Sequence, residues 1–124
     1  MLADRGLDAA ISALAARSPV PVGVDITAER LPDPVESAAY FVVAEALTNA
    51  AKHAQAAEIS VRITRHRDLL VVEVIDDGAG GADPSRGSGL RGLADRVAAV
   101  EGHLTVTSPP GGPTVIRAEL PCGS

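Results

Sequence analysis

The sequence is poor in aromatic residues and in cysteine, and both shortages limit what the protein can be. Aromatic residues make up 2% of the 124 residues, namely Tyr40 and Phe41, so the hydrophobic core has to consist of Ala, Val, Leu and Ile. The single cysteine, Cys122, excludes an internal disulfide and a cysteine-based metal cluster. No apolar run reaches the roughly 18 residues of a membrane span, and the N-terminus lacks the basic-then-apolar order of a signal peptide. We therefore expect a cytoplasmic location and no membrane contact.

Positive charge is also scarce. The chain has 11 Lys and Arg against 16 Asp and Glu, a formal net charge of -5. General nucleic-acid binding needs a basic footprint, so no nucleic-acid partner is expected. Ten of the basic residues are arginine and the remaining one is Lys52. Its isolation marks Lys52 for a specific role, although chance placement on a solvated helix face explains it equally well.

Length and pattern predict one domain with three helices and five strands. A chain of this size buries roughly two thirds of its unfolded surface. The apolar spacings predict the order helix, strand, helix, strand, strand, helix, strand, strand. The expected bounds are 2–17, 20–26, 33 to about 54, 58–66, 69–75, 90–100, 103–107 and 114–120. This order is typical of an α/β fold of the two-layer α+β type, in which helices cover one face of a mixed sheet.

Local signals refine these elements. The second helix is expected to begin with Asp33 as its N-cap, Pro34 at the first helical position and Glu36 closing a capping box. A proline and a glycine in the first strand place it at a sheet edge. The two strands around the turn at 67–68 should pair as an antiparallel hairpin. Gly102 is expected to stop the third helix.

Four polar residues of the second helix follow the spacing i, i+4, i+7, i+8 and therefore share one face: Glu45, Asn49, Lys52 and His53. Together these residue types suit a site for a metal and a phosphate. An asparagine oxygen suits Mg²⁺, a glutamate polarises water or holds the metal shell, and lysine and histidine neutralise phosphate charge. An ordinary solvated helix face is the alternative interpretation.

A second candidate group follows the strand that ends at residue 75. Asp76 is expected at the sheet margin, where its carboxylate can accept from the amine of adenine while Gly78 and Gly80 leave room for the base. A turn-forming Asp-Asp-Gly segment is the alternative. Residues 87–89 precede a helix whose N-terminal amides favour phosphate oxygens. The literal dinucleotide fingerprint at 87–92 is rejected, because no strand comes immediately before it.

Four segments resemble, in order, the ATP-binding boxes of two-component sensor histidine kinases. Residues 45–54 resemble the N box, 76–80 the first glycine box, 87–90 the second glycine box and 110–114 the final glycine-threonine segment. Order and spacing agree over about residues 33–120. The short interval between the glycine boxes, without a phenylalanine box, resembles the nitrate-sensor and desaturase-type subfamily.

The resemblance implies the Bergerat ATP-binding fold, with ATP and Mg²⁺ as cofactors. By position, the residues that it implies for nucleotide binding are Asp76, Gly78, Gly80, Gly87, Ser88, Gly89, Leu90 and Thr114. The catalytic residues that it implies are Glu45, Asn49, Lys52 and His53. Within this set, Asn49 is the Mg²⁺ ligand and Glu45 lies beside it as a base or metal-shell residue. Lys52 and His53 face the phosphates.

The function that the resemblance implies is donation of the γ-phosphoryl group of ATP to a histidine on a separate dimerisation domain, in a phosphorelay that reaches a response regulator. No histidine precedes the first strand, and none of the three in the chain is a credible phosphoacceptor. We therefore expect a catalytic part of a longer kinase, which can be membrane-anchored, or a domain acting in trans, and little autophosphorylation by the chain alone. Residues 1–18 are expected to be a helix or linker from the dimerisation region, and residues 19–124 the catalytic domain.

Two other functions remain open from the sequence. A protein serine kinase of the anti-sigma-factor type would phosphorylate a serine on an antagonist protein. A nucleotide-gated interaction module would bind ATP without transferring phosphate. Acid lability separates the first from a histidine kinase, since phosphohistidine is lost in acid and phosphoserine survives.

Overall fold

The computed structural model describes residues 2–27, 31–50, 57–78, 88–111 and 113–122, which form a five-stranded sheet and three helices. The sheet order is β1-β2-β3-β5-β4, with β1 parallel to β2 and the other neighbours antiparallel. The elements along the chain are α1 (Leu2–Ala16), β1 (Val22–Ile26), α2 (Asp33–Asn49), β2 (Ile59–His66), β3 (Leu69–Asp76), α3 (Ser88–Ala99), β4 (His103–Thr107) and β5 (Thr114–Pro121). The predicted element order, the edge position of the first strand and the central hairpin are confirmed.

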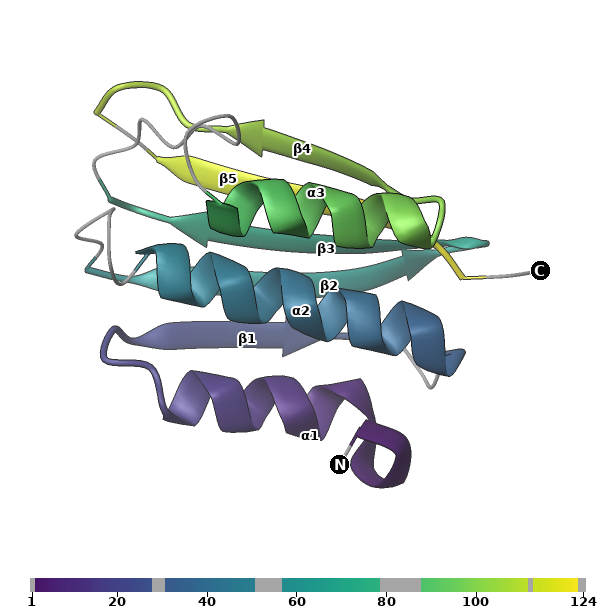
Figure 1. Ribbon diagram of the computed structural model, residues 1–124. Helices are drawn as coiled ribbons and strands as arrows, with labels where there is room; N and C mark the ends of the chain where they lie inside the picture. Colours follow the sequence, from purple (N-terminus) through teal and green to yellow (C-terminus); the bar gives the residue numbers. More distant parts are fainter. Residues whose placement is uncertain (1, 28–30, 51–56, 79–87, 112, 123–124) are drawn as a thin grey trace.

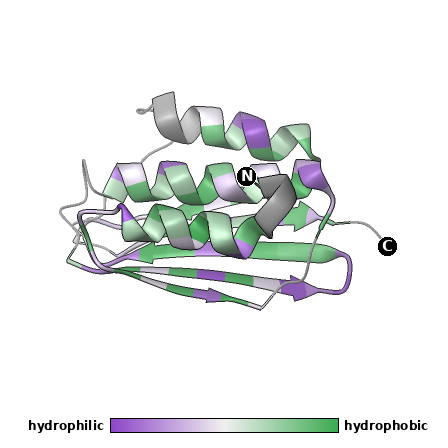
Figure 2. Ribbon diagram, turned by 90° about the horizontal axis from the view of Figure 1, so that it is seen from below, coloured by the Kyte–Doolittle hydropathy of each residue, from purple (hydrophilic) through white to green (hydrophobic). Residues whose placement is uncertain are grey.

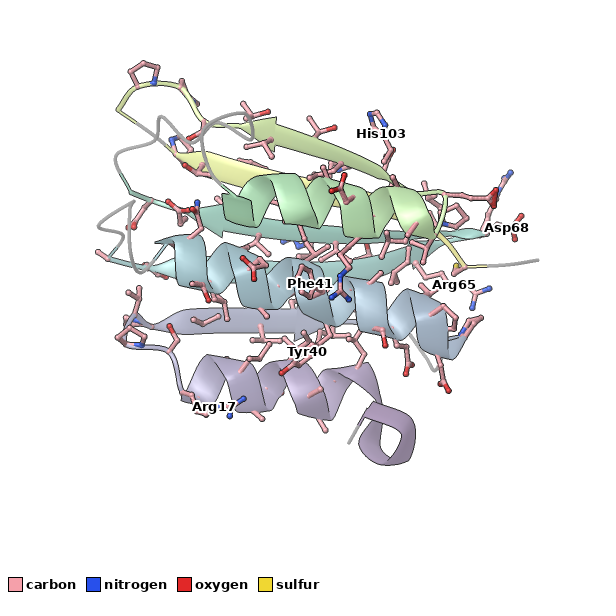
Figure 3. The ribbon with its side chains drawn as sticks, viewed as in Figure 1. Arg17, Tyr40, Phe41, Arg65, Asp68 and His103 are labelled. Carbon is pink, nitrogen blue, oxygen red and sulfur yellow. The ribbon has the colours of Figure 1, made fainter. Side chains whose placement is uncertain are left out.

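The helices lie together on one face of the sheet, so the predicted two-layer architecture is also confirmed (Figure 1). Buried residues alternate with more exposed ones along β2 and β5, whereas β3 buries residues 70–72 in succession. Hydrophobic positions recur along α2 (Figure 2). The buried core contains no aromatic residue among those described. Tyr40 and Phe41 are only partly buried, and the Arg96 guanidinium of α3 lies 4.2 Å from the centroid of the Phe41 ring (Figure 3).

α1 packs against α2 and β1, and two of its side chains, Leu7 and Ile11, belong to the same core as the sheet. The helix has a kink at Gly6, whose φ is 81°. The assignment of residues 1–18 to a dimerisation region stays a prediction. No helix in the described part of the chain is long and apolar enough to cross a membrane.

The predicted capping box at the start of α2 is wrong. The N-cap is Pro32, which makes no side-chain cap, and Asp33 is already helical. Glu36 is 1% exposed, and its Oε2 accepts a hydrogen bond from the backbone N–H of Leu31 at 3.0 Å. The observed N-cap, Pro32, has no N–H that could close a capping box, and the Glu36 carboxylate accepts from the N–H of Leu31 instead. Glu36 still binds a backbone N–H at the helix start, but two residues before the predicted partner, Asp33.

At the end of α3, Gly102 is needed because another strand passes close to it, and not because its backbone is left-handed. The left-handed residue is Glu101, with φ 61°. The N–H of Gly102 donates to the Val97 carbonyl at 2.8 Å, and that of Glu101 to the Ala98 carbonyl at 2.9 Å, the pattern of a Schellman motif. A Cβ on Gly102 would lie 2.8 Å from the Glu119 carbonyl oxygen. The helix therefore ends where predicted, with Glu101 as the left-handed residue of the stop, and position 102 requires glycine because β5 approaches it closely.

We predict that Gly102→Ala lowers the free energy of unfolding by about 1–3 kcal/mol, the usual cost of overpacking. The new methyl group would also lie 2.8 Å from Leu120 Cδ2 and 2.9 Å from Val97 Cγ1. Urea unfolding measures the change. Gly23→Ala is the matched control, because a Cβ there meets nothing within 4 Å. Equal stability of the two variants would show that the contact at Gly102 is not tight.

Candidate functional site

The described members of the two predicted site groups lie on elements that end or begin at the same end of the sheet (Figure 1). The C-terminal end of α2, the end of β3 and the beginnings of α3 and β5 meet there. Asp76, the last residue of β3, pairs in register with Ile59 on one side and Thr114 on the other. Asp68, in the hairpin turn between β2 and β3, and His103, at the start of β4, lie at the opposite end (Figure 3).

Asp76 is a buried carboxylate at a strand end. It is 3% exposed, and its Oδ1 accepts a hydrogen bond from the Gly78 N–H at 2.9 Å. Burial raises the pKa of Asp76 above its ordinary value; the Gly78 N–H opposes this rise, and the negative charge of Asp77 adds to it. A buried acceptor that is costly to ionise needs a donor, and an amine of a bound ligand fits this requirement.

The raised pKa gives opposite pH trends for stability and for ligand binding. Because the folded-state pKa lies above the unfolded one, the ionised carboxylate opposes folding at neutral pH. That penalty is relieved as the pH falls through the folded-state pKa and is absent below the unfolded value. Protonation also removes the anionic acceptor, so we predict that ATP affinity falls over the same range. Calorimetry across pH, repeated with Asp76→Asn to subtract the titration of ATP itself, checks this; identical pH profiles would contradict it.

Thr114 is the second buried polar residue of this strand end. It is 2% exposed, lies opposite Asp76 in the sheet register, and its Oγ1 is 2.6 Å from Ser108 Oγ. The contact restrains the Thr114 side chain, in the residue that pairs with Asp76 in the sheet register. Ser108 was missed from the sequence, where only its position between a strand and a Pro-Pro-Gly turn could have marked it.

Asn49 and Glu45 lie on the last turns of α2, and both side chains are half-buried. Helix geometry one turn apart places them on one face, as predicted. After Asn49 the N–H of Ala50 donates to the carbonyls of both Ala46 and Leu47, so the helix has not yet unwound there. Lys52 and His53 lie outside the described residues, and their predicted roles stay predictions.

Asn49 and Glu45 suit a Mg²⁺ ion whose other coordinating oxygens come from bound phosphates and water. Within the described ranges no group of three or more His, Cys, Asp or Glu side chains can enclose a metal ion. Mg²⁺ keeps few protein ligands and is usually completed by substrate phosphates and water. One amide oxygen from Asn49, with Glu45 a turn away, matches that mode of binding.

The glycine-rich segments are only partly described. Gly78 is buried beside Asp76, whereas Gly80 and Gly87 lie outside the described residues. Ser88, Gly89 and Leu90 form the first turn of α3, which begins two residues before the expected start. Because the first backbone N–H groups of a helix have no partner within it, this turn can face phosphate oxygens.

A separate hollow of about 310 Å³ lies between α1 and α2. Its walls are Leu14, Arg17, Ser18, Pro19, Ala44, Leu47 and Thr48. Its lining includes one cation, Arg17, and no carboxylate that could accept from an adenine amine. The site at the end of β3 remains the candidate.

Known proteins resemble this chain in sequence over most of its length. Residues 35–124 match the family model described as histidine kinase-, DNA gyrase B- and HSP90-like ATPase. The oxygen sensor histidine kinase NreB of Staphylococcus carnosus is 32% identical over 97% of this chain and 38% of its own length. The histidine-protein kinase/phosphatase DegS of Brevibacillus brevis is 35% identical over 75% of this chain and 25% of its own. The chain thus spans less than two fifths of these curated relatives.

Solved structures of histidine kinases have a similar fold. The blue-light activated histidine kinase EL346 of Erythrobacter litoralis superposes with a TM-score of 0.80 and 26% identity over 94% of this chain and 41% of that one. Its separate histidine kinase domain gives a TM-score of 0.74 and 26% identity over 95% of this chain and 58% of that one. The predicted fold class is confirmed by this likeness.

Proposed function

Because this chain belongs to the histidine kinase-, DNA gyrase B- and HSP90-like ATPase family, we propose that it is the catalytic domain of a sensor histidine kinase. It binds ATP with Mg²⁺ and presents the γ-phosphoryl group to a histidine on a separate dimerisation domain. The observation that carries the proposal is the buried Asp76 carboxylate at the end of β3, opposite Thr114. The kinase relatives and the order of the four boxes support it.

In this proposal the adenine base sits at the end of β3. Asp76 accepts the adenine amine through Oδ2, since Oδ1 already accepts from Gly78. Thr114, oriented by Ser108, presents its hydroxyl beside the carboxylate. Guanine carries an oxygen where adenine carries the amine, so an anionic acceptor here selects adenine.

The phosphates lie toward the end of α2. Asn49 would hold Mg²⁺ with Glu45 beside it, and the ion would supply positive charge for the phosphate oxygens. Lys52, His53 and the first turn of α3 supply further positive potential for the phosphates. Transfer then depends on positioning and charge stabilisation, because phosphoryl transfer leaves little covalent chemistry for a protein to perform.

A transfer assay tests the proposal. The chain is incubated with γ-labelled ATP, Mg²⁺ and the histidine-bearing dimerisation domain of the same kinase. Label in the dimerisation domain that is lost in acid supports a histidine kinase. Acid-stable label would favour the serine kinase, and ATP binding without transfer would favour an interaction module, so either result overturns the proposal.

A further inference from the structure

Asp77 makes long-range contacts that a turn residue does not need. Its Oδ1 accepts hydrogen bonds from the backbone N–H groups of Ala57 at 2.8 Å and Glu58 at 3.0 Å, 20 and 19 residues away in the sequence. Its own N–H donates to the Glu58 carbonyl at 3.3 Å. A local turn would instead bind the side chain to a neighbour two residues on, as Asp76 does with Gly78. Asp77 therefore ties the end of β3 to the start of β2.

This tie sets the path of the backbone that follows Asp76. Three hydrogen bonds hold residue 77 against residues 57 and 58, just beyond the last register pair of the two strands, Ile59 with Asp76. The next residue is Gly78, whose N–H meets Asp76 Oδ1 at 2.9 Å. The hydrogen bonds of Asp77 thus hold the backbone that carries the Gly78 N–H, and this N–H in turn binds Oδ1 of the Asp76 carboxylate.

We propose that Asp77 is a positioning residue for adenine recognition: its side chain holds the 77–78 backbone against the start of β2, so that the Asp76 carboxylate keeps the direction that meets the adenine amine. The inference rests on the proposed function, because it requires Asp76 to bind adenine. Asp77 itself touches no ligand. Its charge is exposed, and its contribution is the placement of the residue before it.

The test compares ATP with purine riboside triphosphate, which lacks the 6-amino group. The ratio of the two affinities reports the contact between the amine and Asp76. We expect Asp77→Ala to reduce this ratio by about fivefold, the size of one weakened hydrogen bond. A merely structural role would weaken both ligands equally and leave the ratio unchanged, so an unchanged ratio would overturn the inference.

Asp77→Asn is the rescue variant, because its amide oxygen can accept the same two N–H groups, and we expect it to keep the wild-type ratio. If the Asp77→Ala protein unfolds, Asp77→Glu replaces it. Its longer side chain moves the accepting oxygen by one methylene group, so the ratio should also fall. Asp68→Ala, an exposed aspartate at the far end of the sheet, is the matched control. A ratio in Asp77→Asn as low as in Asp77→Ala would contradict the role of the acceptor.

A second measurement is independent of any ligand. If Asp77 Oδ1 protects the amides of Ala57 and Glu58, their hydrogen exchange accelerates in Asp77→Ala and not in Asp77→Asn. The two proposals fail differently. A wild-type chain that binds no ATP defeats the proposed function, whereas a wild-type chain that prefers ATP over the 6-desamino analogue, with an unchanged preference in Asp77→Ala, defeats only the inference about Asp77.

Discussion

Asp76→Asn is expected to weaken binding of adenine nucleotide at least tenfold, about 1.4 kcal/mol. The amide loses the negative charge and offers one acceptor oxygen in place of two. In the wild type one carboxylate oxygen is already taken by the Gly78 N–H. The asparagine oxygen can therefore serve either Gly78 or the base, while its NH₂ group would face the adenine amine donor to donor. Isothermal calorimetry with ATP and Mg²⁺ measures the loss.

Stability separates this loss from damage to the fold. Burial raises the pKa of Asp76, so its ionised carboxylate opposes folding at neutral pH. The asparagine amide is neutral and removes this penalty. The unliganded Asp76→Asn protein should therefore melt no lower than the wild type at neutral pH. Asp68→Asn, the exposed aspartate at the other end of β3, should leave ATP affinity unchanged. Equal ATP affinity in wild type and Asp76→Asn would remove the adenine role from this residue.

Asn49→Ala is expected to lower the rate of phosphoryl transfer roughly 10²-fold or more, the usual effect of removing one preorganised group that stabilises transition-state charge. The side chain lies at the end of α2, where its amide oxygen is the proposed protein ligand of Mg²⁺. The proposed adenine contact at Asp76 does not involve the Asn49 side chain. ATP affinity in the absence of Mg²⁺ should therefore change less than the transfer rate. Single-turnover transfer to the dimerisation domain measures the effect.

Thr48→Ala is the matched control for Asn49. Thr48 is the preceding residue of the same helix, is exposed, and donates its hydroxyl to the Ala44 carbonyl within the helix. Its removal should leave both transfer and the Mg²⁺ dependence of ATP binding near wild type. If Asn49→Ala transfers phosphate at the wild-type rate, the metal-binding role belongs to another residue.

Much of the fold could be read from the sequence because periodicity depends on local chemistry. Alternation in residues 58–66 and the apolar run at 69–75, on either side of a tight turn, predicted the hairpin of β2 and β3. The start signals at 33–36 and the apolar face of the following residues predicted α2. Apart from the end of α2, whose expected last residues lie outside the described ones, the observed and expected bounds differ by no more than two residues. Such shifts occur where tertiary contacts choose the last residue of an element.

The features that sequence reasoning missed are set by contacts between distant segments. The Asp77 side chain reaches residues about 20 positions away, and the Ser108 hydroxyl meets Thr114 across a turn. Gly102 is constrained by β5 rather than by its own φ. In each case the residue type fits an ordinary local role, so nothing in the local pattern could reveal its partner. The position of Asp76 at a strand end could be predicted because strand, acid and glycine are adjacent in the chain.

The most direct test of the account is a titration of this chain with ATP in the presence and absence of Mg²⁺, followed by calorimetry and by thermal unfolding. The account predicts saturable binding of one nucleotide, strengthened by Mg²⁺. It also predicts a rise in Tm that corresponds to about 2.7 kcal/mol of added stability at one hundred times Kd. Absence of binding heat together with an unchanged Tm at saturating ATP and Mg²⁺ would contradict it.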